Sequence, residues 1–219
     1  MTAAHVRSVN VGRPKPVPWG ELQRSAIDKH SVTGPVRVRR LGLAGDEVAD
    51  KRHHGGIDQA VYGYAREDLD WWAEQLGREL RDGQFGENLT VAGIDMTGAF
   101  IGERWRIGTA ELEVCCPRIP CSVFQGFMGE QRWVKRFTQQ ARPGAYFRVS
   151  AEGELAMGDP IEIVYRPDHD VRLGEVFRAL TGDRDLVPKL LAAPELPEEA
   201  RMYAKKILAT SPWRDAELG

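Results

Sequence analysis

The chain has 219 residues, enough to bury one sizeable core, and its length predicts one main domain with at most a small addition. Its formal net charge of −2 gives no reason to expect binding to nucleic acid. There is no run of about 18 apolar residues that would span a bilayer, and the opening MTAAHVRSVNVGRPKP has Arg and Pro where a secretory signal has its apolar stretch. These features predict a cytoplasmic protein that binds neither membranes nor nucleic acid.

The first three quarters of the chain consist mainly of predicted short strands. Period-two alternation or β-rich composition marks residues 36–43, 59–65, 87–91, 105–116 and 145–165. Two helices are predicted between them, at residues 66–77 and 129–141, each with apolar side chains on one face. Many short strands with few long helices favour a closed or half-closed β-barrel, which we expect over residues 1–166.

The pattern changes to short helices after residue 166. Helical segments are predicted at residues 173–180, 186–193 and 197–209. Because helices this short are unstable alone, they must pack on each other or on the barrel. The predicted fold class is therefore mainly β with α, a barrel followed by a small three-helix domain over residues 167–219, which covers the barrel or shapes a surface for substrate or reductase.

All three cysteines lie in one stretch, CCPRIPC, at residues 115–121. An odd number of thiols in a cytoplasmic chain argues against a disulfide framework. Cys121 follows Arg118 at the predicted end of a strand, and a guanidinium stabilises a thiolate. The residues alone leave a packing role and a reactive role equally open for Cys121. Alternation along the strand predicts that Cys115 and Cys116 point to opposite faces, one of them into the core, and that neither is a ligand.

Two further stretches combine polar side chains with glycines. In HHGG, Gly55 and Gly56 allow the backbone to approach a ligand closely, and two imidazoles lie beside them. Lone histidines more often cap loops than catalyse, and the charged residues before the motif are explained by a solvated loop with cancelling charges. In FGENL, Glu87 and Asn88 either bind the polar edge of a ligand or fix a turn, and the residues favour the turn.

Several common catalytic motifs are absent from the sequence. There is no GxGxxG after a strand, no GxxxxGK[ST] and no GxSxG, so dinucleotide, phosphate-loop and α/β-hydrolase functions have no motif. The adjacent cysteines lack the C-x-x-C spacing that zinc favours, and three thiols are too few for an iron–sulfur cluster.

The order of four motifs gives the chain a family resemblance. HHGG with a strand ending in Tyr, then GENLTVAG, IGERWRIG and PRIPC, resembles the MOSC domain, the β-barrel module named for the C-terminal part of molybdenum cofactor sulfurases. The stand-alone bacterial members called YiiM-like are the most similar, since they also carry a short three-helix segment after the barrel. The resemblance covers nearly the whole chain.

The resemblance implies a molybdenum cofactor (molybdopterin with molybdenum) and a role for each motif residue. It makes Cys121 the metal ligand, since a soft thiolate suits molybdenum. The implied cofactor-binding residues are Arg118, Arg52, Gly55, Gly56, Glu87 and Asn88, and the implied proton sources are His53, His54 and Asp58. Many relatives have a lysine two residues after the cysteine, where this chain has Val123, and Lys135 or Arg136 is a candidate replacement.

The implied activity is the reduction of N-hydroxylated compounds, such as hydroxylaminopurines or other hydroxylamines, to amines. The chain has no flavin, nicotinamide or iron–sulfur motif, so electrons are expected from a separate reductase, and no pyridoxal phosphate is expected. Two alternatives remain open: a carrier of cofactor, or of sulfur as a persulfide on Cys121, and a Cys–His hydrolase using Cys121 with His53 or His54. The chain is also expected to be able to form a homodimer. For the reductase, the carrier and the hydrolase alike, Cys121 and the HHGG loop should line one cavity at an end of the barrel.

Overall fold

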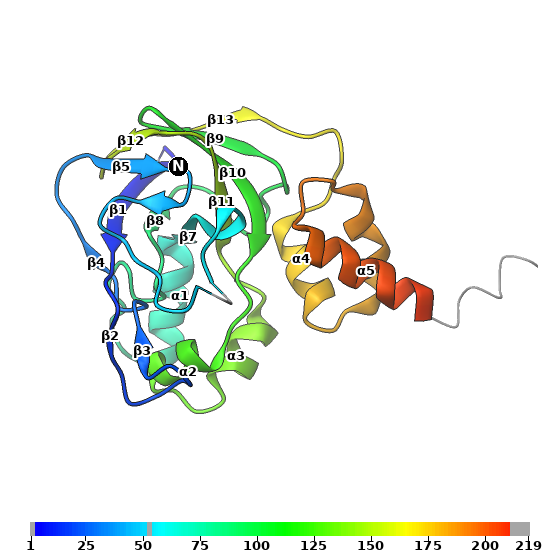
Figure 1. Ribbon diagram of the computed structural model, residues 1–219, viewed down its shortest axis with the longest axis horizontal. Coiled ribbons are helices and arrows are strands. Elements are labelled where there is room, and N and C mark those ends of the chain that lie inside the picture. The colour runs from blue at the N-terminus through cyan, green and yellow to red at the C-terminus, as the bar shows by residue number, and fades with distance from the viewer. Residues whose placement is uncertain (1–2, 52–53, 211–219) are drawn as a thin grey trace, which may run out of the picture.

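The computed structural model describes residues 3–51 and 54–210 of the protein (Figure 1). The predicted sites Arg52 and His53 therefore lie outside the described residues. The strands of the described part are β1 (His5–Val11), β2 (Lys15–Pro16), β3 (Arg24–Ser25), β4 (His30–Ser31), β5 (Val36–Arg39), β6 (Gly42–Leu43), β7 (Val61–Ala65), β8 (Leu89–Ala92), β9 (Arg104–Ile107), β10 (Ala110–Pro117), β11 (Ala145–Ala151), β12 (Gly153–Leu155) and β13 (Ile161–Tyr165). The helices are the 3-10 turn η1 (Ile57–Gln59), α1 (Arg66–Leu76), α2 (Ser122–Met128), α3 (Trp133–Gln140), α4 (Leu173–Leu180), the 3-10 helix η2 (Arg184–Ala192) and α5 (Glu198–Thr210).

An eight-stranded sheet forms the centre of the molecule. Its order is β13-β9-β10-β11-β7-β8-β1-β4, and smaller sheets are built by β12-β5-β6 and β2-β3. Neighbours in the large sheet are antiparallel except β7 and β8, which run parallel. Apolar side chains on one face of these strands, among them Val9, Trp105 and Phe147, form the main core.

The predicted closed barrel is not shown. The large sheet ends at β13 and β4, and β1 meets the start of β13 through a single isolated bridge between His5 and Pro160. Two backbone hydrogen bonds flank this bridge, from Val6 N to Asp159 O at 2.9 Å and from Ile161 N to Ala4 O at 2.9 Å. The fold is therefore a mixed α/β fold around an open sheet.

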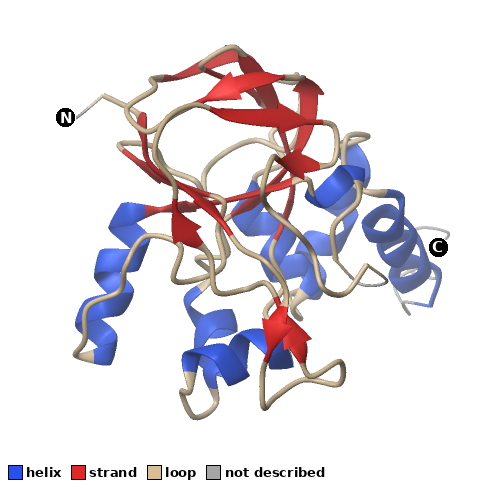
Figure 2. Cartoon of the chain, turned by 60° about the vertical axis from the view of Figure 1, so that its left-hand side comes forward, coloured by secondary structure: helices blue, strands red, loops and turns tan. Residues whose placement is uncertain are grey.

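Three helices lie at one end of the large sheet and enclose a second core. Figure 2 shows helices gathered on one side of the strands. Helix α1 was predicted at residues 66–77 and spans Arg66–Leu76, where Gly77 ends it in the left-handed region at φ 64°. The predicted helix at residues 129–141 is wrong at its start, because Arg132 is left-handed at φ 55° and α3 begins only at Trp133. This second core is mainly aromatic and includes Trp72, Phe85, Phe124, Trp133 and Phe137.

The C-terminal segment lies beside β10, where α4 and α5 are seen at the right of Figure 1. Its helical elements follow the predicted order, but the middle one, η2, is a 3-10 helix containing Pro188, which has no N–H for an α-helical bond. Side chains of all three elements, such as Val176, Val187 and Ala204, belong to the same core as the strands. A separate three-helix domain is therefore not shown. Within the described part of the chain, no helix has the length and apolar character needed to cross a membrane.

Replacing Phe177 with alanine should destabilise the whole protein. Phe177 of α4 is fully buried and meets Phe137 of α3 edge-on, with ring centroids 6.4 Å apart. Truncating a buried phenylalanine costs about 3–5 kcal/mol, and here the loss should appear in one cooperative urea transition followed by tryptophan fluorescence. Leu191→Ala is the matched control, because Leu191 is 42 % exposed and should change stability by less than about 1 kcal/mol. Two separate transitions would contradict the shared core.

Candidate functional site

Cys121 lies where the end of β10 passes into helix α2. It is the N-cap residue of α2, with extended backbone angles of φ −129° and ψ 174°, and its thiol is partly exposed. The backbone N–H of Phe124, in the first turn of α2, favours the charged form of the sulfur. Cys121 therefore lies at the junction between the end of a strand and the first turn of a helix, where the free N–H groups of the helix favour negative charge.

The charge of the Cys121 sulfur is set by its neighbours. Burial alone would raise the pKa of this thiol, but a hydrogen bond from His54, the positive charge of Arg118 and the N–H of Phe124 outweigh it. Together they lower the pKa of Cys121 to about 7. Since the thiolate is the form that binds metals and attacks electrophiles, this sulfur is more readily reactive near neutral pH than an ordinary cysteine.

Arg118 is a buried cation held by aromatic rings. Its side chain is 7 % exposed, and its guanidinium lies 4.2 Å from the ring centre of Phe124 and 5.0 Å from that of Tyr62. It also donates a hydrogen bond to the carbonyl of Phe85. Burial would lower the pKa of Arg118, but nearby Tyr62, Tyr146 and Cys121 raise it. Among the described residues, no carboxylate lies within ion-pair distance of Arg118, so its charge favours an anion at Cys121.

Two tyrosines complete the surroundings of the thiol. Cys116 of β10 pairs with Tyr146 of β11, which pairs in turn with Tyr62 of β7, so the three side chains form one row across the sheet. The rings of Tyr62 and Tyr146 lie 5.1 Å apart, and the Tyr62 hydroxyl donates to Pro143 O at 2.8 Å. Burial raises the pKa of Tyr146, so its hydroxyl stays protonated and can donate. Sequence reasoning missed both tyrosines, because only strand pairing brings them beside the cysteines.

The loop that carries HHGG brings His54 to Cys121. The His54 N–H donates to Asp50 O at 3.0 Å, and Gly55 and Gly56 follow with φ values of 81° and 82°, a region that favours glycine. The 3-10 turn η1 comes next and carries Asp58. We call the group of side chains around the sulfur the thiol site; its members are Cys121, His54, Arg118, Tyr62 and Tyr146.

Comparison with known proteins places the thiol site in a family. The family model of the MOSC domain matches residues 50–162, slightly more than half of the chain and a range that contains the whole thiol site. The chain belongs to the MOSC domain family. It is 35% identical over 167 residues to YflK of Bacillus subtilis (strain 168), covering 76% of each protein, and 32% identical over 184 residues to YiiM of Escherichia coli (strain K12), covering 81% of this chain and 82% of YiiM. The crystal structure of YiiM from Geobacillus stearothermophilus has a TM-score of 0.78 and 29% identity, over 93% of this chain and 98% of that one. The 219-residue chain is thus a YiiM-like MOSC protein.

The predicted proton source Asp58 is held in an ion pair of this MOSC protein. Its Oδ1 lies 2.6 Å from Nε of Arg148 on β11. The same guanidinium donates to Glu113 Oε1 at 3.0 Å and to Glu195 O at 2.6 Å. Through Arg148, Asp58 therefore connects the HHGG loop to the sheet and to the C-terminal segment. Its carboxylate accepts a hydrogen bond from a guanidinium that Glu113 and Glu195 also hold in place.

Glu87 and Asn88 face inward in the MOSC protein. The Glu87 carboxylate, 0 % exposed, accepts hydrogen bonds from Gly83 N at 2.6 Å, Phe85 N at 2.9 Å and Thr90 Oγ1 at 2.8 Å. The Asn88 side chain accepts from Tyr62 N at 3.1 Å and donates to Asp46 Oδ2 at 2.8 Å. These contacts are those of the turn that the sequence favoured. They position β7 and β8, and through β7 they position Tyr62.

The lysine that many relatives carry after the cysteine has no replacement on α3 among the described contacts. Arg136 ion-pairs with Glu130 at 3.5 Å, and Lys135 is exposed. A buried cation is instead supplied by Lys29, which ion-pairs with Asp46 and lies close enough to Arg118 for the two charges to interact. Burial lowers the pKa of Lys29 and Asp46 raises it, with burial the larger effect. Lys29 could not be found from the sequence, since a single lysine in a loop has no motif.

Cys115 and Cys116 lie at an irregularity of β10. The pairing of β10 with β11 shifts between Val114 and Cys116, which leaves Cys115 as the extra residue of a β-bulge. Cys115 is buried in the core and Cys116 is partly exposed, in agreement with the prediction that one of the two faces the core. The bulge itself was not predictable from alternation along the strand.

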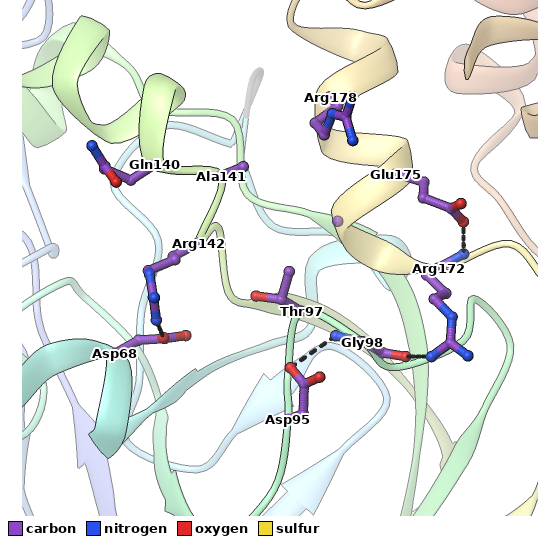
Figure 3. Close-up of a pocket in the computed structure, with 11 residues that line it drawn as sticks. Asp68, Asp95, Thr97, Gly98, Gln140, Ala141, Arg142, Arg172, Glu175 and Arg178 are labelled. Carbon is purple, nitrogen blue, oxygen red and sulfur yellow. Dashed lines mark hydrogen bonds and ion pairs between the residues drawn. The ribbon is translucent and has the colours of Figure 1, made fainter. Parts of the chain in front are cut away.

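A large cavity of the structure lies away from the thiol site. It has a volume of about 480 Å³ between the end of α3, the turn at residues 95–98 and the start of α4 (Figure 3). Two of its arginines have polar partners: Arg142 forms an ion pair with Asp68, and Arg172 donates to Gly98 O at 2.8 Å. No member of the thiol site lines this cavity, so we do not assign the cavity to the candidate active site.

Replacing His54 with alanine should raise the pKa of Cys121 above about 7, because the hydrogen bond that stabilises the thiolate is lost. A rise of one pH unit in this pKa lowers the thiolate fraction at pH 7 about fivefold, and alkylation by iodoacetamide should slow equally. The rate at Cys121, followed by peptide mass between pH 5 and 9, measures the shift. His5→Ala on β1 is the control and should leave the profile unchanged. An unchanged profile in His54→Ala would show that the contact does not act on the thiol.

Proposed function

We propose that this MOSC protein binds the molybdenum cofactor at Cys121 and reduces N-hydroxylated compounds to amines with electrons from a separate reductase. The observation that carries the proposal is the thiol site itself. A soft sulfur donor, ionised at neutral pH, stands beside a buried cation that has no carboxylate partner among the described residues. Family membership adds support, because the MOSC domain is associated with binding of this cofactor.

The donor chemistry of the site fits the cofactor. Molybdenum in its pterin complex already has sulfur ligands, and a thiolate is the protein ligand that such a soft centre prefers. The cofactor carries a phosphate, which requires positive charge, and Arg118 and Lys29 supply two buried cations in this region. The glycines at 55 and 56 leave room for close approach of a ligand to the loop backbone. When bound, the cofactor would supply the two-electron chemistry.

The residues of the chain then have distinct tasks. Cys121 would hold the metal, and His54 would hold a proton at hydrogen-bond distance from the sulfur. Arg118 would keep the site positive without binding the ligand directly, since aromatic rings enclose its guanidinium. The protonated hydroxyl of Tyr146 would be an additional donor in place of Asp58, whose carboxylate is paired with Arg148.

A Cys–His hydrolase is the second candidate, and one observation favours it. The hydrogen bond between His54 and Cys121 is the contact that activates a cysteine nucleophile in such enzymes. A hydrolase also needs donors for an oxyanion, and the N–H of Phe124 acts on the sulfur itself by favouring its charged form. The thiol site therefore supports a ligand-binding sulfur better than an attacking one.

Activity measured on protein from two hosts separates the candidates. The protein is purified from a host that makes molybdenum cofactor and from one that does not. Each sample receives a hydroxylamine or an N-hydroxylated purine with reduced viologen as electron donor. The proposal predicts reduction to the amine only by protein from the first host. Bound cofactor without turnover of any N-hydroxylated compound would indicate a carrier. Ester or amide hydrolysis by both samples, blocked by iodoacetamide, would indicate a hydrolase.

A further inference from the structure

Strand β13 leaves one edge of the large sheet open. Among the described strands it is hydrogen-bonded only to β9, and it lies at the top edge of the strands in Figure 1. The chain before β1 reaches only its start, where Ile161 N donates to Ala4 O at 2.9 Å. Because N–H groups two residues apart in a strand point the same way, the N–H of Ile163 also points away from β9. No described carbonyl accepts a hydrogen bond from it on that side.

This open edge is apolar. Ile163, Val164 and Tyr165 are 39 %, 36 % and 43 % exposed, and Glu162 is the one charged residue of the strand. Unpaired N–H and C=O groups beside exposed apolar side chains bind another strand, so proteins usually protect such an edge with lysine, proline or a covering segment. Beyond Ile161, no described segment covers the edge of β13. The edge therefore offers a place for a further strand.

A bulge decides which side chains of β13 share a face. The pairing with β9 shifts between Ile163 and Tyr165, which leaves Val164 as the extra residue. Glu162 and Tyr165 each lie opposite an arginine of β9, and the arginines of that strand face away from the core. Two outer-face residues thus flank Ile163 and Val164, so the order of faces is the same in both directions along the strand. An antiparallel copy of β13 matches it face for face.

The two ends of β13 carry opposite charge. Glu162 stands near the start, and its carboxylate is exposed. At the other end the guanidinium of Arg104 lies 4.6 Å from the ring centre of Tyr165, and Arg166 follows in an extended conformation that the next residue, Pro167, favours. In an antiparallel pair of β13 strands, the acidic end of each meets the basic end of the other. A parallel pair would place like charges together.

We propose that β13 pairs with β13 of a second copy of this chain, antiparallel and about a two-fold axis between Ile163 and Val164. The result is a homodimer in which one sheet continues through both copies, and every contact occurs twice. The inference is independent of the proposed function, because no member of the thiol site lies on β13. A strand pair this short buries less than about 1,000 Å², so the dimer forms weakly and depends on protein concentration.

Sedimentation velocity of the full chain tests the proposal. The dimer fraction should rise between about 1 and 100 µM protein and should fall when salt is raised from about 0.05 to 0.5 M, because salt screens the attraction. Glu162→Lys should weaken the dimer at least about tenfold at low salt, since it brings like charges together, and salt should then strengthen association. Glu74→Lys, the same charge change on an exposed residue of α1, should behave as the wild type. A wild type that stays monomeric, or two variants that behave alike, would overturn the proposal.

Cross-linking tests the position of the axis. Val164→Cys places a thiol beside its counterpart in the second copy, so oxidation with copper phenanthroline should give a covalent dimer that dithiothreitol separates. The wild-type chain, which has three cysteines of its own, is the first control and should give no such dimer. Met157→Cys is the second, because Met157 is 66 % exposed but lies outside β13. Equal cross-linking of the two variants, or none in Val164→Cys, would contradict pairing through β13.

Discussion

Replacing Cys121 with serine is expected to lower the molybdenum content of the purified protein at least about tenfold, since changing even the partners of metal ligands costs about 10–100-fold in affinity. The serine hydroxyl stays neutral at pH 7 and offers a hard oxygen where a soft sulfur is needed. Cys121 is the N-cap of α2, a position where serine is strongly preferred, so the fold should be kept. Metal analysis of protein from a cofactor-producing host gives the result.

The other two cysteines are the matched controls for this measurement. Cys116→Ser and Cys115→Ala are expected to retain molybdenum, because neither sulfur belongs to the thiol site. Cys115 is fully buried, so its replacement should appear as lower stability instead. Equal loss of metal from all three variants would mean that the whole cysteine stretch, and not Cys121 alone, binds the cofactor.

Replacing Glu87 with alanine is expected to destabilise the protein by about 3–5 kcal/mol. The carboxylate is fully buried and accepts from two backbone N–H groups and one hydroxyl, and each buried donor left without a partner costs about 1–3 kcal/mol. Glu87→Gln should lose less, because its amide oxygen still accepts. Urea unfolding of the three proteins measures the difference. A loss below about 1 kcal/mol in Glu87→Ala would show that water replaces the carboxylate.

The pH dependence of stability gives a second signature of Glu87. Burial raises the pKa of this carboxyl above its ordinary value of 4.5, and the hydrogen bonds from Thr90, Gly83 and Phe85 lower it by less. The native state therefore binds this proton more tightly than the unfolded chain. The contribution is complete below pH 4.5 and is lost as pH rises through the raised pKa. Glu87→Gln should lack this part of the pH profile, and an identical profile would contradict the shifted pKa.

The parts of the fold that sequence predicts are those set by local pattern. Helix α1 was recognisable from its apolar face and from Gly77, which ends it in the left-handed region. The helical segments after residue 171 were recognisable from the same periodicity. Closure of the barrel was not predictable in this way, because it depends on how β1 meets Pro160, a contact between residues far apart in the chain. Periodicity shows which residues form strands but not which strands pair.

The same limit applies to the thiol site. The order of the motifs pointed to Cys121 and His54, and the structure brings them together. The bulge at Cys115 and the row of tyrosines beside it depend on the register of β10 against β11, which no local pattern gives. Asp58 was named as a proton source because it follows HHGG, yet its partner Arg148 comes from a strand 90 residues later.

The central claim is that Cys121 holds a molybdenum cofactor, and the most direct test is metal and pterin analysis of the wild-type chain. The protein is purified without reducing or chelating agents from a host that makes the cofactor. Molybdenum is measured by mass spectrometry, and the pterin is measured after oxidation to its fluorescent form. The account predicts about one molybdenum and one pterin per chain at full loading. Protein from this host that contains neither, while its Cys121 still reacts as a thiolate at pH 7, would contradict the account.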